Sequence, residues 1–232
     1  MIFFVAEIGV NWDGDFITLK DMLTFAKKLG CNAVKFQAYN EDIIKNHPQK
    51  SRLIKSAVSK TNVEYINKLA SEVNIEWFCT PMYKEAVDFL EPYVKRFKIR
   101  EADGRVLLEN KSSKLIDRIL STKKEIIISS ATDPSRSKYY NNTKIKWLYV
   151  VPKYPCSPSD LDFRDIKKFD GYSNHCPYII APLSAAVLGA KIIEVHMTSS
   201  KSKDYIDNAV SFDYLELENL VKMIRLYEKM IT

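Results

Sequence analysis

The sequence is short of residues that several function classes require. It has no apolar run near the roughly 20 residues of a membrane-spanning helix, and residues 1–10 have neither a basic lead nor a small-residue cleavage site. We therefore expect a cytoplasmic protein with no membrane contact. Only 6 glycines are present, without a phosphate-binding glycine turn, and four cysteines are scattered at Cys31, Cys79, Cys156 and Cys176. Thiols without a C-x-x-C pair argue against a disulfide framework or a zinc knuckle.

The charge balance limits the partners. The chain has 35 basic and 29 acidic residues, a net charge of +6, and its lysines are interspersed with carboxylates. Nucleic-acid binding requires a clustered basic face with aromatic or groove-reading motifs, and the sequence has neither. We expect a small anionic substrate and no nucleic acid.

Strand-like and helix-like segments alternate along the chain. Runs of β-branched and aromatic residues predict eight strands, at 2–8, 33–37, 76–79, 97–99, 125–129, 145–151, 169–172 and 191–196. Helical periodicity predicts helices at 17–30, 62–73, 83–90, 105–121, 159–168, 178–190 and 212–230, with a loop at 133–144. Eight such alternations predict an α/β protein with the TIM (β/α)8 barrel fold, built as a single domain over residues 1–232.

In this fold, catalytic groups collect at the carboxyl ends of the strands and on the loops that follow. Nearly every predicted strand end carries a polar residue. These residues are Glu7, Asn11, Lys35, Gln37, Thr80, Lys98, Asp103, Ser129, Ser130, Tyr154, Ser173, Asn174, His175, Glu194 and His196. We take them as candidates for the active site.

Two of the three histidines fall at the ends of neighbouring predicted strands. Adjacent strands lie about 4.8 Å apart, so His175 and His196 can share one divalent metal ion, with other positions left to water, substrate or a carboxylate. Two histidines alone are weak evidence for a metal site. The alternative is that both are hydrogen-bonded histidines at the barrel mouth. His47 lies in a predicted loop and is expected to be exposed.

Side-chain alternation places Glu194 and His196 on one face of the last strand. If His196 points into the mouth, Glu194 points into the barrel, where a carboxylate needs a partner. Lys35 and Lys98 carry the matching charges on other strands. The group is either an internal ion pair that fills the barrel or a pocket for a phosphorylated or carboxylated ligand.

Hydroxyl groups at strand ends are candidate ligands of a phosphate. Ser129 and Ser173 can offer hydroxyls and backbone amides, although serines in turns are more often caps. The proline after Thr80 imposes extended geometry and holds that hydroxyl at the rim. Prolines stiffen the loop that presents Tyr154 over the mouth, where it either contacts a sugar or has a structural role.

The candidate residues fall within short motifs that follow one another along the chain. The motifs are AEIGVNWDG (6–14), AVKFQ (33–37), FCTP (78–81), FKI (97–99) followed by Asp103, IIISS (126–130), YP (154–155), SNH (173–175), GAKIIEVH (189–196), and Asp207 followed by Ser211. In this order and spacing the chain resembles the sialic acid synthase family, which comprises N-acetylneuraminate synthases and their relatives acting on other nonulosonic acids and spore-coat polysaccharide precursors. The resemblance covers about residues 4–220.

The resemblance implies a reaction and a cofactor. The family joins phosphoenolpyruvate to the aldehyde of an N-acylated hexosamine, for surface polysaccharides, using a divalent metal, usually Mn²⁺ with Mg²⁺ as the alternative. The implied catalytic residues are Glu7, Lys98, His175 and His196, of which the two histidines bind the metal. Phosphoenolpyruvate would be held by Lys35, Lys98, Thr80, Ser129 and Ser173, and the amino sugar by Gln37, Asp103, Tyr154 and Asp207.

Departures from the family pattern keep other functions open. Glu101 stands where a serine helps to hold phosphoenolpyruvate, Pro152 replaces an asparagine, and Asn174 replaces the aspartate of S-D-H. Trp12 stands where a histidine is frequent. A glutamate that faces a phosphate repels it, so either Glu101 turns away or the ligand differs. The alternatives are a degenerate barrel that binds a phosphorylated ligand or a partner enzyme without turnover, and a metal-dependent aldolase or isomerase.

The sequence ends near residue 230, before the C-terminal antifreeze-like domain of full-length relatives. In those relatives this domain reaches into the partner's active site with an arginine. Relatives form face-to-face dimers, so we expect a homodimer, with a separate protein as a possible source of the missing domain.

Overall fold

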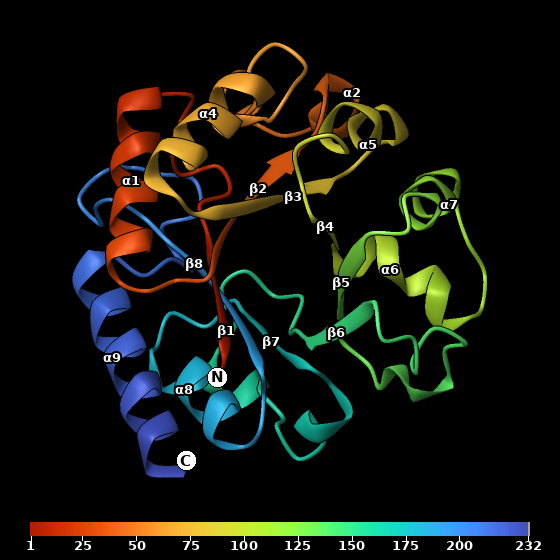
Figure 1. Cartoon of the computed structure of the whole chain (residues 1–232), viewed down its shortest axis with the longest axis vertical. Helices are drawn as coiled ribbons and strands as arrows, with labels where there is room; N and C mark the ends of the chain where they lie inside the picture. The colour runs from red at the N-terminus through yellow and green to blue at the C-terminus, as the bar shows by residue number, and fades with distance from the viewer. Residues whose placement is uncertain (232) are drawn as a thin grey trace.

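A computed structural model describes residues 1–231. Eight parallel strands close into a barrel in sequence order, and helices surround it (Figure 1). The strands are β1 (Phe3–Glu7), β2 (Ala33–Ala38), β3 (Glu76–Pro81), β4 (Arg96–Ile99), β5 (Glu125–Ser130), β6 (Ile145–Tyr149), β7 (Gly171–Asn174) and β8 (Ile192–His196). The predicted TIM barrel is confirmed, and each predicted strand boundary lies within two residues of the observed one.

The α-helices form the outer layer of the barrel. They are α1 (Phe16–Lys28), α2 (Glu41–Ile44), α3 (Lys50–Ser56), α4 (Val63–Val73), α5 (Lys84–Leu90), α6 (Glu101–Leu108), α7 (Lys114–Ser121), α8 (Ile180–Val187) and α9 (Tyr214–Ile231). Short 3₁₀ turns are η1 (Pro134–Arg136), η2 (Pro158–Asp160) and η3 (Ile166–Lys168). Within residues 1–231, no helix combines the length and apolar character needed to cross a membrane.

Local sequence explains where the helices begin and end. At α1, the Asp15 carboxylate accepts hydrogen bonds from the backbone N–H groups of Ile17 and Thr18, which have no partner inside the helix. At α4, a regular spacing of buried side chains faces the barrel, and the helix stops at Asn74, whose φ of 55° is left-handed. These caps and apolar faces fix the helices against the strands.

Two helix predictions are wrong. The segment 105–121 forms two helices, α6 and α7, because the chain turns between them at Asn110, which has a φ of 57°. The segment 159–168 contains only η2 and η3. There the side chains of Ser157 and Asp162 accept hydrogen bonds from nearby backbone N–H groups and compete with helix formation. The helices α2 and α3 were not predicted, whereas 133–144 is a loop with one 3₁₀ turn, as expected.

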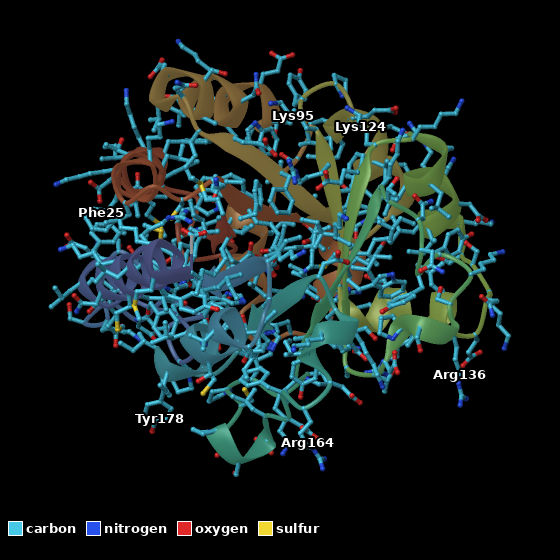
Figure 2. All side chains as sticks on the ribbon, turned by 60° about the horizontal axis from the view of Figure 1, so that its bottom comes forward. Phe25, Lys95, Lys124, Arg136, Arg164 and Tyr178 are labelled. Atoms are coloured by element: carbon cyan, nitrogen blue, oxygen red, sulfur yellow. The ribbon has the colours of Figure 1, made fainter. Side chains whose placement is uncertain are left out.

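Side chains alternate between the outer and the inner face of each strand. In β2, Phe36 faces outward and contacts the Trp77 ring, with centroids 5.9 Å apart, whereas Lys35 and Gln37 line the interior. The outer faces and the helices make one apolar core. Charged side chains extend from the periphery, as Lys95, Arg136 and Arg164 do in Figure 2. The polar residues inside the barrel are therefore exceptions that mark the site.

Candidate active site

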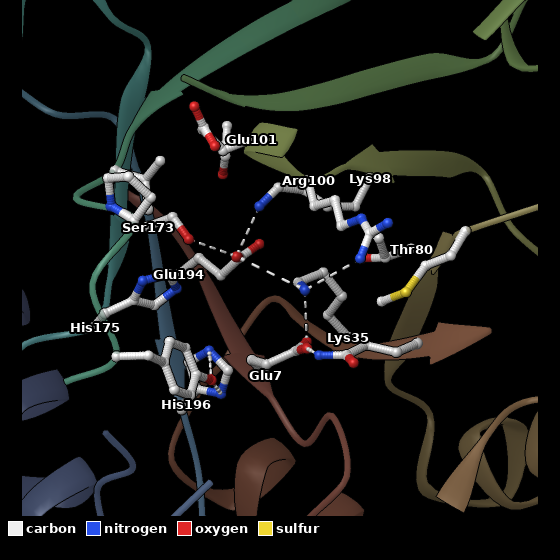
Figure 3. Close-up of a pocket in the computed structure, with 16 residues that line it drawn as sticks. Glu7, Lys35, Thr80, Lys98, Arg100, Glu101, Ser173, His175, Glu194 and His196 are labelled. Carbon is white, nitrogen blue, oxygen red and sulfur yellow. Dashed lines mark hydrogen bonds and ion pairs between the residues drawn. The ribbon is translucent and has the colours of Figure 1, made fainter. Parts of the chain in front are cut away.

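A cavity of about 140 Å³ lies where the carboxyl ends of the strands meet (Figure 3). Its wall contains ten of the twelve residues to which the family resemblance assigns a role in the site. These are Glu7, Lys35, Gln37, Thr80, Lys98, Ser129, Tyr154, Ser173, His175 and His196. Glu194, Arg100, Glu101 and Pro152 also line the cavity, whereas Asp103 and Asp207 are not among its lining residues. His47 is exposed, as predicted.

A cluster of four charges forms the floor of the cavity. Lys98 Nζ lies 2.8 Å from Glu194 Oε1, and Lys35 Nζ lies 3.8 Å from the same oxygen and 2.8 Å from Glu7 Oε2. The Ser173 hydroxyl donates to Glu194 Oε1 at 2.8 Å. All four charged side chains are buried, so each charge depends on its neighbours for stabilisation. The internal ion pair, one of the two alternatives that the sequence left open, is present and lies in the wall of the cavity. The other alternative, a pocket for a phosphorylated or carboxylated ligand, stays a prediction.

The cluster shifts the pKa values of its members. Burial raises the pKa of Glu194, but Lys35 and Lys98 outweigh it and lower that pKa to about 2. For Lys35, burial lowers the pKa, and the Glu194 and Glu7 carboxylates overcome it so that the pKa is raised. Burial dominates at Lys98, whose pKa is lowered despite Glu194. Glu194 is therefore a carboxylate at neutral pH.

Glu7 is held at the end of β1 from two sides. The Gln37 amide donates to Glu7 Oε1 at 3.0 Å, opposite the ion pair with Lys35. Lys35 also donates a long hydrogen bond of 3.4 Å to the Thr80 hydroxyl. Two side chains of the neighbouring strand β2 thus hold the Glu7 carboxylate at the cavity.

Three buried oxygens of cavity-lining residues make no hydrogen bond within the described chain, and one of them, Glu7 Oε2, is in an ion pair with Lys35. Of the buried side-chain atoms that the structure describes, Ser129 Oγ and Glu194 Oε2 are among those without a hydrogen bond. Burial of a polar atom without a hydrogen-bond partner costs free energy, unless a ligand or a water molecule provides the partner. Both atoms belong to residues that line the cavity, which supports a bound polar ligand.

His175 and His196 meet at the mouth with ring centroids 5.6 Å apart. His175 Nδ1 lies 3.0 Å from the Val151 carbonyl oxygen, which favours the tautomer with a proton on Nδ1 and leaves Nε2 as a lone-pair donor. Burial, and next the neighbouring His196, lower the pKa of His175 to about 3, so the ring is neutral at pH 7. Neutral imidazole is the form that binds metal ions.

The spacing of the rings is compatible with one shared metal ion. An ion about 2.1 Å from each nitrogen lies about 3.3 Å from each ring centre, so rings less than about 6.6 Å apart can both reach it. In the described part of the chain, no group of three or more His, Cys, Asp and Glu residues has a metal-binding arrangement. Water or substrate would fill the other positions, and the metal stays a prediction.

Tyr154 and Asp207 flank His196. The Tyr154 hydroxyl lies 3.0 Å from His196 Nε2 and 3.1 Å from Nδ1, and Asp207 Oδ2 lies 3.4 Å from Nδ1. Although Tyr154 is half exposed, its hydroxyl is turned inward, and burial followed by the Asp207 charge raises its pKa well above the ordinary value. Asn11 accepts from the Asp207 backbone N–H at 3.2 Å and fixes that loop.

The residues after β4 differ from the sequence expectation. Asp103, predicted to place the sugar, binds the Arg100 guanidinium through Nε and Nη2. Arg100 itself lines the cavity and was not predicted, although its position directly after a strand was a signal. Glu101 also lines the cavity, but Arg105 holds its carboxylate with two hydrogen bonds of 2.7 and 2.8 Å.

Two departures from the family pattern are structural. Asn174 is fully buried, accepts from the Tyr172 hydroxyl and donates to the Cys176 carbonyl oxygen. Trp12 is fully buried, and its indole N–H donates to the Ser56 carbonyl oxygen. Both side chains stabilise loops beside the site without lining the cavity.

The fold and the site define a class of protein, a (β/α)8 barrel enzyme whose strand ends enclose a lysine–glutamate cluster beside paired histidines. Residues 22–232 match the NeuB family, and the chain belongs to that family of synthases. The resemblance to sialic acid synthases is confirmed.

Individual relatives agree with this assignment. The chain is 30% identical to N,N'-diacetyllegionaminic acid synthase of Legionella pneumophila, over 96% of this chain and 71% of that protein. It is 28% identical to human N-acetylneuraminate-9-phosphate synthase, over 98% of this chain and 70% of that protein. The crystal structure of N-acetylneuraminic acid (sialic acid) synthetase from Leptospira borgpetersenii, in complex with citrate, matches with a TM-score of 0.84 and 26% identity, covering 99% of this chain and 85% of that one.

Proposed function

We propose that this protein condenses phosphoenolpyruvate with the aldehyde of an N-acylated hexosamine to give a nonulosonic acid for surface polysaccharide synthesis. One observation carries the proposal: Glu7, two buried lysines and two histidines converge on one cavity. A barrel that only binds a ligand has no need of all five groups. The relatives named as legionaminic acid and N-acetylneuraminate-9-phosphate synthases support the same product class.

The floor of the cavity suits a compact anion. Lys35 and Lys98 offer ammonium groups, and the Thr80 and Ser129 hydroxyls lie in the same wall. At about 140 Å³, the cavity is smaller than the roughly 300–1,000 Å³ of sites for drug-sized ligands. Charged groups that are already oriented before binding stabilise an anion without reorganisation. In our proposal these residues hold the carboxylate and phosphate of phosphoenolpyruvate.

The reaction forms one carbon–carbon bond and breaks one carbon–oxygen bond. The enol carbon attacks the aldehyde carbon, and the aldehyde oxygen takes a proton and becomes a hydroxyl. Water adds to the resulting cationic carbon and loses a proton, and the tetrahedral intermediate then expels phosphate with its bridging oxygen and leaves a ketone. Glu7 accepts the proton of that water or stabilises the cation, and its two-sided support by Gln37 and Lys35 favours this role. Tyr154 and Gln37 contact the amino sugar, and Asp207 acts through His196, whose Nδ1 lies 3.4 Å from its carboxylate.

We further propose a divalent metal, Mn²⁺ or Mg²⁺, on His175 and His196. When bound, it polarises the aldehyde carbonyl. Support comes from the neutral His175 ring, whose Nδ1 is already engaged by the Val151 carbonyl oxygen.

The proposal is tested by phosphate release from phosphoenolpyruvate with a panel of N-acyl hexosamines, with and without a 6-phosphate, in the presence of Mn²⁺. We expect release with at least one sugar, none after EDTA treatment, and none from the His196→Ala variant. Tight binding of phosphoenolpyruvate without release from any sugar contradicts catalysis and supports a binding module. Metal-dependent cleavage of a sugar phosphate without phosphoenolpyruvate supports an aldolase.

The predicted homodimer is part of the proposal. Light scattering of the purified protein distinguishes the outcomes, because a mass equal to one 26.8 kDa chain contradicts a dimer.

A further inference from the structure

The cavity contains a third cation beyond the two lysines. Lys35 and Lys98 lie in ion pairs with Glu7 and Glu194, so the floor cluster has no net charge. Arg100 stands above that cluster in the same wall, on the side of Thr80 in Figure 3. Arg100 is itself ion-paired with Asp103, but Asp103 is not among the residues that line the cavity, so only the cation of this pair faces it. Phosphoenolpyruvate carries several negative charges, and the floor cluster alone does not neutralise them.

The Arg100 side chain is held from behind. Asp103 contacts its Nε and, at 3.3 Å, its Nη2, while Asp103 itself lies outside the lining of the cavity. The guanidinium has five N–H donors in a rigid fork, so this contact leaves Nη1 and part of Nη2 to a ligand. Its side chain is 41% exposed, which leaves it accessible from the cavity mouth.

Glu101, the acidic residue that lines the cavity beside Arg100, already has a counterion. Glu101 forms a two-point ion pair with Arg105, which lies one turn later on α6. Figure 3 shows Glu101 at the edge of the cavity, apart from the ion-pair network. Of the side chains described, none caps the N-terminus of α6, so its first backbone N–H groups also favour an anion.

A hydroxyl without a partner lies on the neighbouring strand. Ser129 Oγ, at the end of β5, is buried and makes no hydrogen bond within the described residues. The helix α6 packs closely on this strand because Gly104 has no side chain: a Cβ there would lie 2.9 Å from Ile128 Cγ2 and 3.5 Å from the Ser129 carbonyl oxygen. Gly104 therefore allows the first turn of α6 to approach Ser129.

We propose that Arg100, positioned by Asp103, binds an oxyanion of phosphoenolpyruvate together with Ser129. The inference rests on the proposed function and adds a substrate-binding residue to it. Asp103 is a positioning residue in this site, and it acts on the substrate through Arg100.

The test is calorimetric binding of phosphoenolpyruvate to the purified full chain, without sugar. Arg100→Ala is expected to weaken binding about tenfold or more, and Arg100→Lys to weaken it less, because a lysine keeps the charge and loses the fork. Asp103→Asn is expected to weaken binding by a smaller factor, with recovery in Asp103→Glu. Arg136→Ala, at an exposed arginine in η1, is the matched control and leaves binding unchanged.

Steady-state kinetics separate this role from a structural one. In Arg100→Ala we expect the KM for phosphoenolpyruvate to rise and the KM for the amino sugar to stay unchanged, with the melting temperature of the wild type. Wild-type affinity in Arg100→Ala, or a loss confined to the sugar, overturns the inference and leaves the proposed function intact. A wild-type protein that binds no phosphoenolpyruvate refutes the proposed function instead.

Discussion

Lys98 Nζ and Glu194 Oε1 lie 2.8 Å apart across the interior of the barrel. Their strands, β4 and β8, stand opposite each other in the closed ring of eight. The same carboxylate oxygen accepts from Ser173 on β7 and lies 3.8 Å from Lys35 on β2. One acidic side chain thus connects four strands.

Replacement of that carboxylate is expected to destabilise the fold. Glu194→Gln keeps the shape of the side chain but leaves Lys35 and Lys98 with one carboxylate, that of Glu7, between them. Removal of one partner from a buried ion pair typically costs about 3–5 kcal/mol. Urea unfolding measures the loss. The matched control is Glu218→Gln, whose partner Lys222 is 65% exposed, and it should cost less than about 1 kcal/mol. Equal losses in the two variants contradict the role of the cluster.

The stability of the metal-free protein is expected to fall as the pH drops below about 6.5. The pKa of His175 is lowered from 6.5 to about 3 in the folded chain, so between these values the unfolded chain binds a proton that the folded chain does not. One such group gives a slope of at most about 1.4 kcal/mol per pH unit. Urea unfolding in EDTA at a series of pH values measures it. His175→Gln should flatten the profile, and His47→Gln, in an exposed loop, should retain the wild-type slope.

The Tyr154 hydroxyl is expected to support the metal that we propose on the histidines. Tyr154→Phe removes the hydroxyl that lies 3.1 Å from His196 Nδ1, the ring nitrogen that does not bind the metal when Nε2 does. Loss of a supporting hydrogen bond around a metal ligand typically lowers metal affinity about 10-fold or more. Titration with Mn²⁺, followed by electron paramagnetic resonance, measures the change. Tyr178→Phe, in an exposed position on the loop after β7, is the control. If Tyr154→Phe binds Mn²⁺ with unchanged affinity, the Tyr154 hydroxyl does not support the metal. If the wild type binds no Mn²⁺, the proposed metal site itself is contradicted.

A methyl group at Gly104 is expected to displace α6 from β5. Its Cβ would lie 2.9 Å from Ile128 Cγ2, a rigid branched side chain with 1% exposure. Overpacking costs about 1–3 kcal/mol, whereas alanine is favoured over glycine in a helix by about 1 kcal/mol. Gly104→Ala should therefore destabilise the wild type and be neutral or stabilising in an Ile128→Ala background. Urea unfolding of the four proteins measures the coupling, and additive effects contradict the contact.

The sequence pattern predicted the barrel because each strand and helix can be recognised from a short segment of the chain. Each strand is a short β-branched run, and the period of each helix shows its buried face. The errors lie where single residues decide, as at Asn110, which ends α6, and in the 157–168 segment, where polar side chains bind the adjacent backbone. Hydrogen bonds from the backbone to these side chains compete with helix formation, but they leave the spacing of the hydrophobic residues almost unchanged. The period of the hydrophobic residues alone therefore does not reveal them.

The sequence predicted those site residues whose position depends only on where a strand ends. Glu7, Lys35, Lys98 and the two histidines lie on strands or directly after them, so the closed ring brings them together. The pairing of Arg100 with Asp103, and of Glu101 with Arg105, depends on side-chain rotamers in the first turn of α6. The sequence pattern singled out Asp103 and Glu101, but neither Arg100 nor Arg105, and it did not show which of the four side chains face the cavity.

The four floor charges come from β1, β2, β4 and β8, and they neutralise one another only when the ring is complete. An intermediate that lacks one side of the barrel would hold ammonium or carboxylate groups away from water without a counterion. Partly folded forms therefore have a high free energy. The charged groups that bind the substrate and the closed sheet form in the same cooperative folding step.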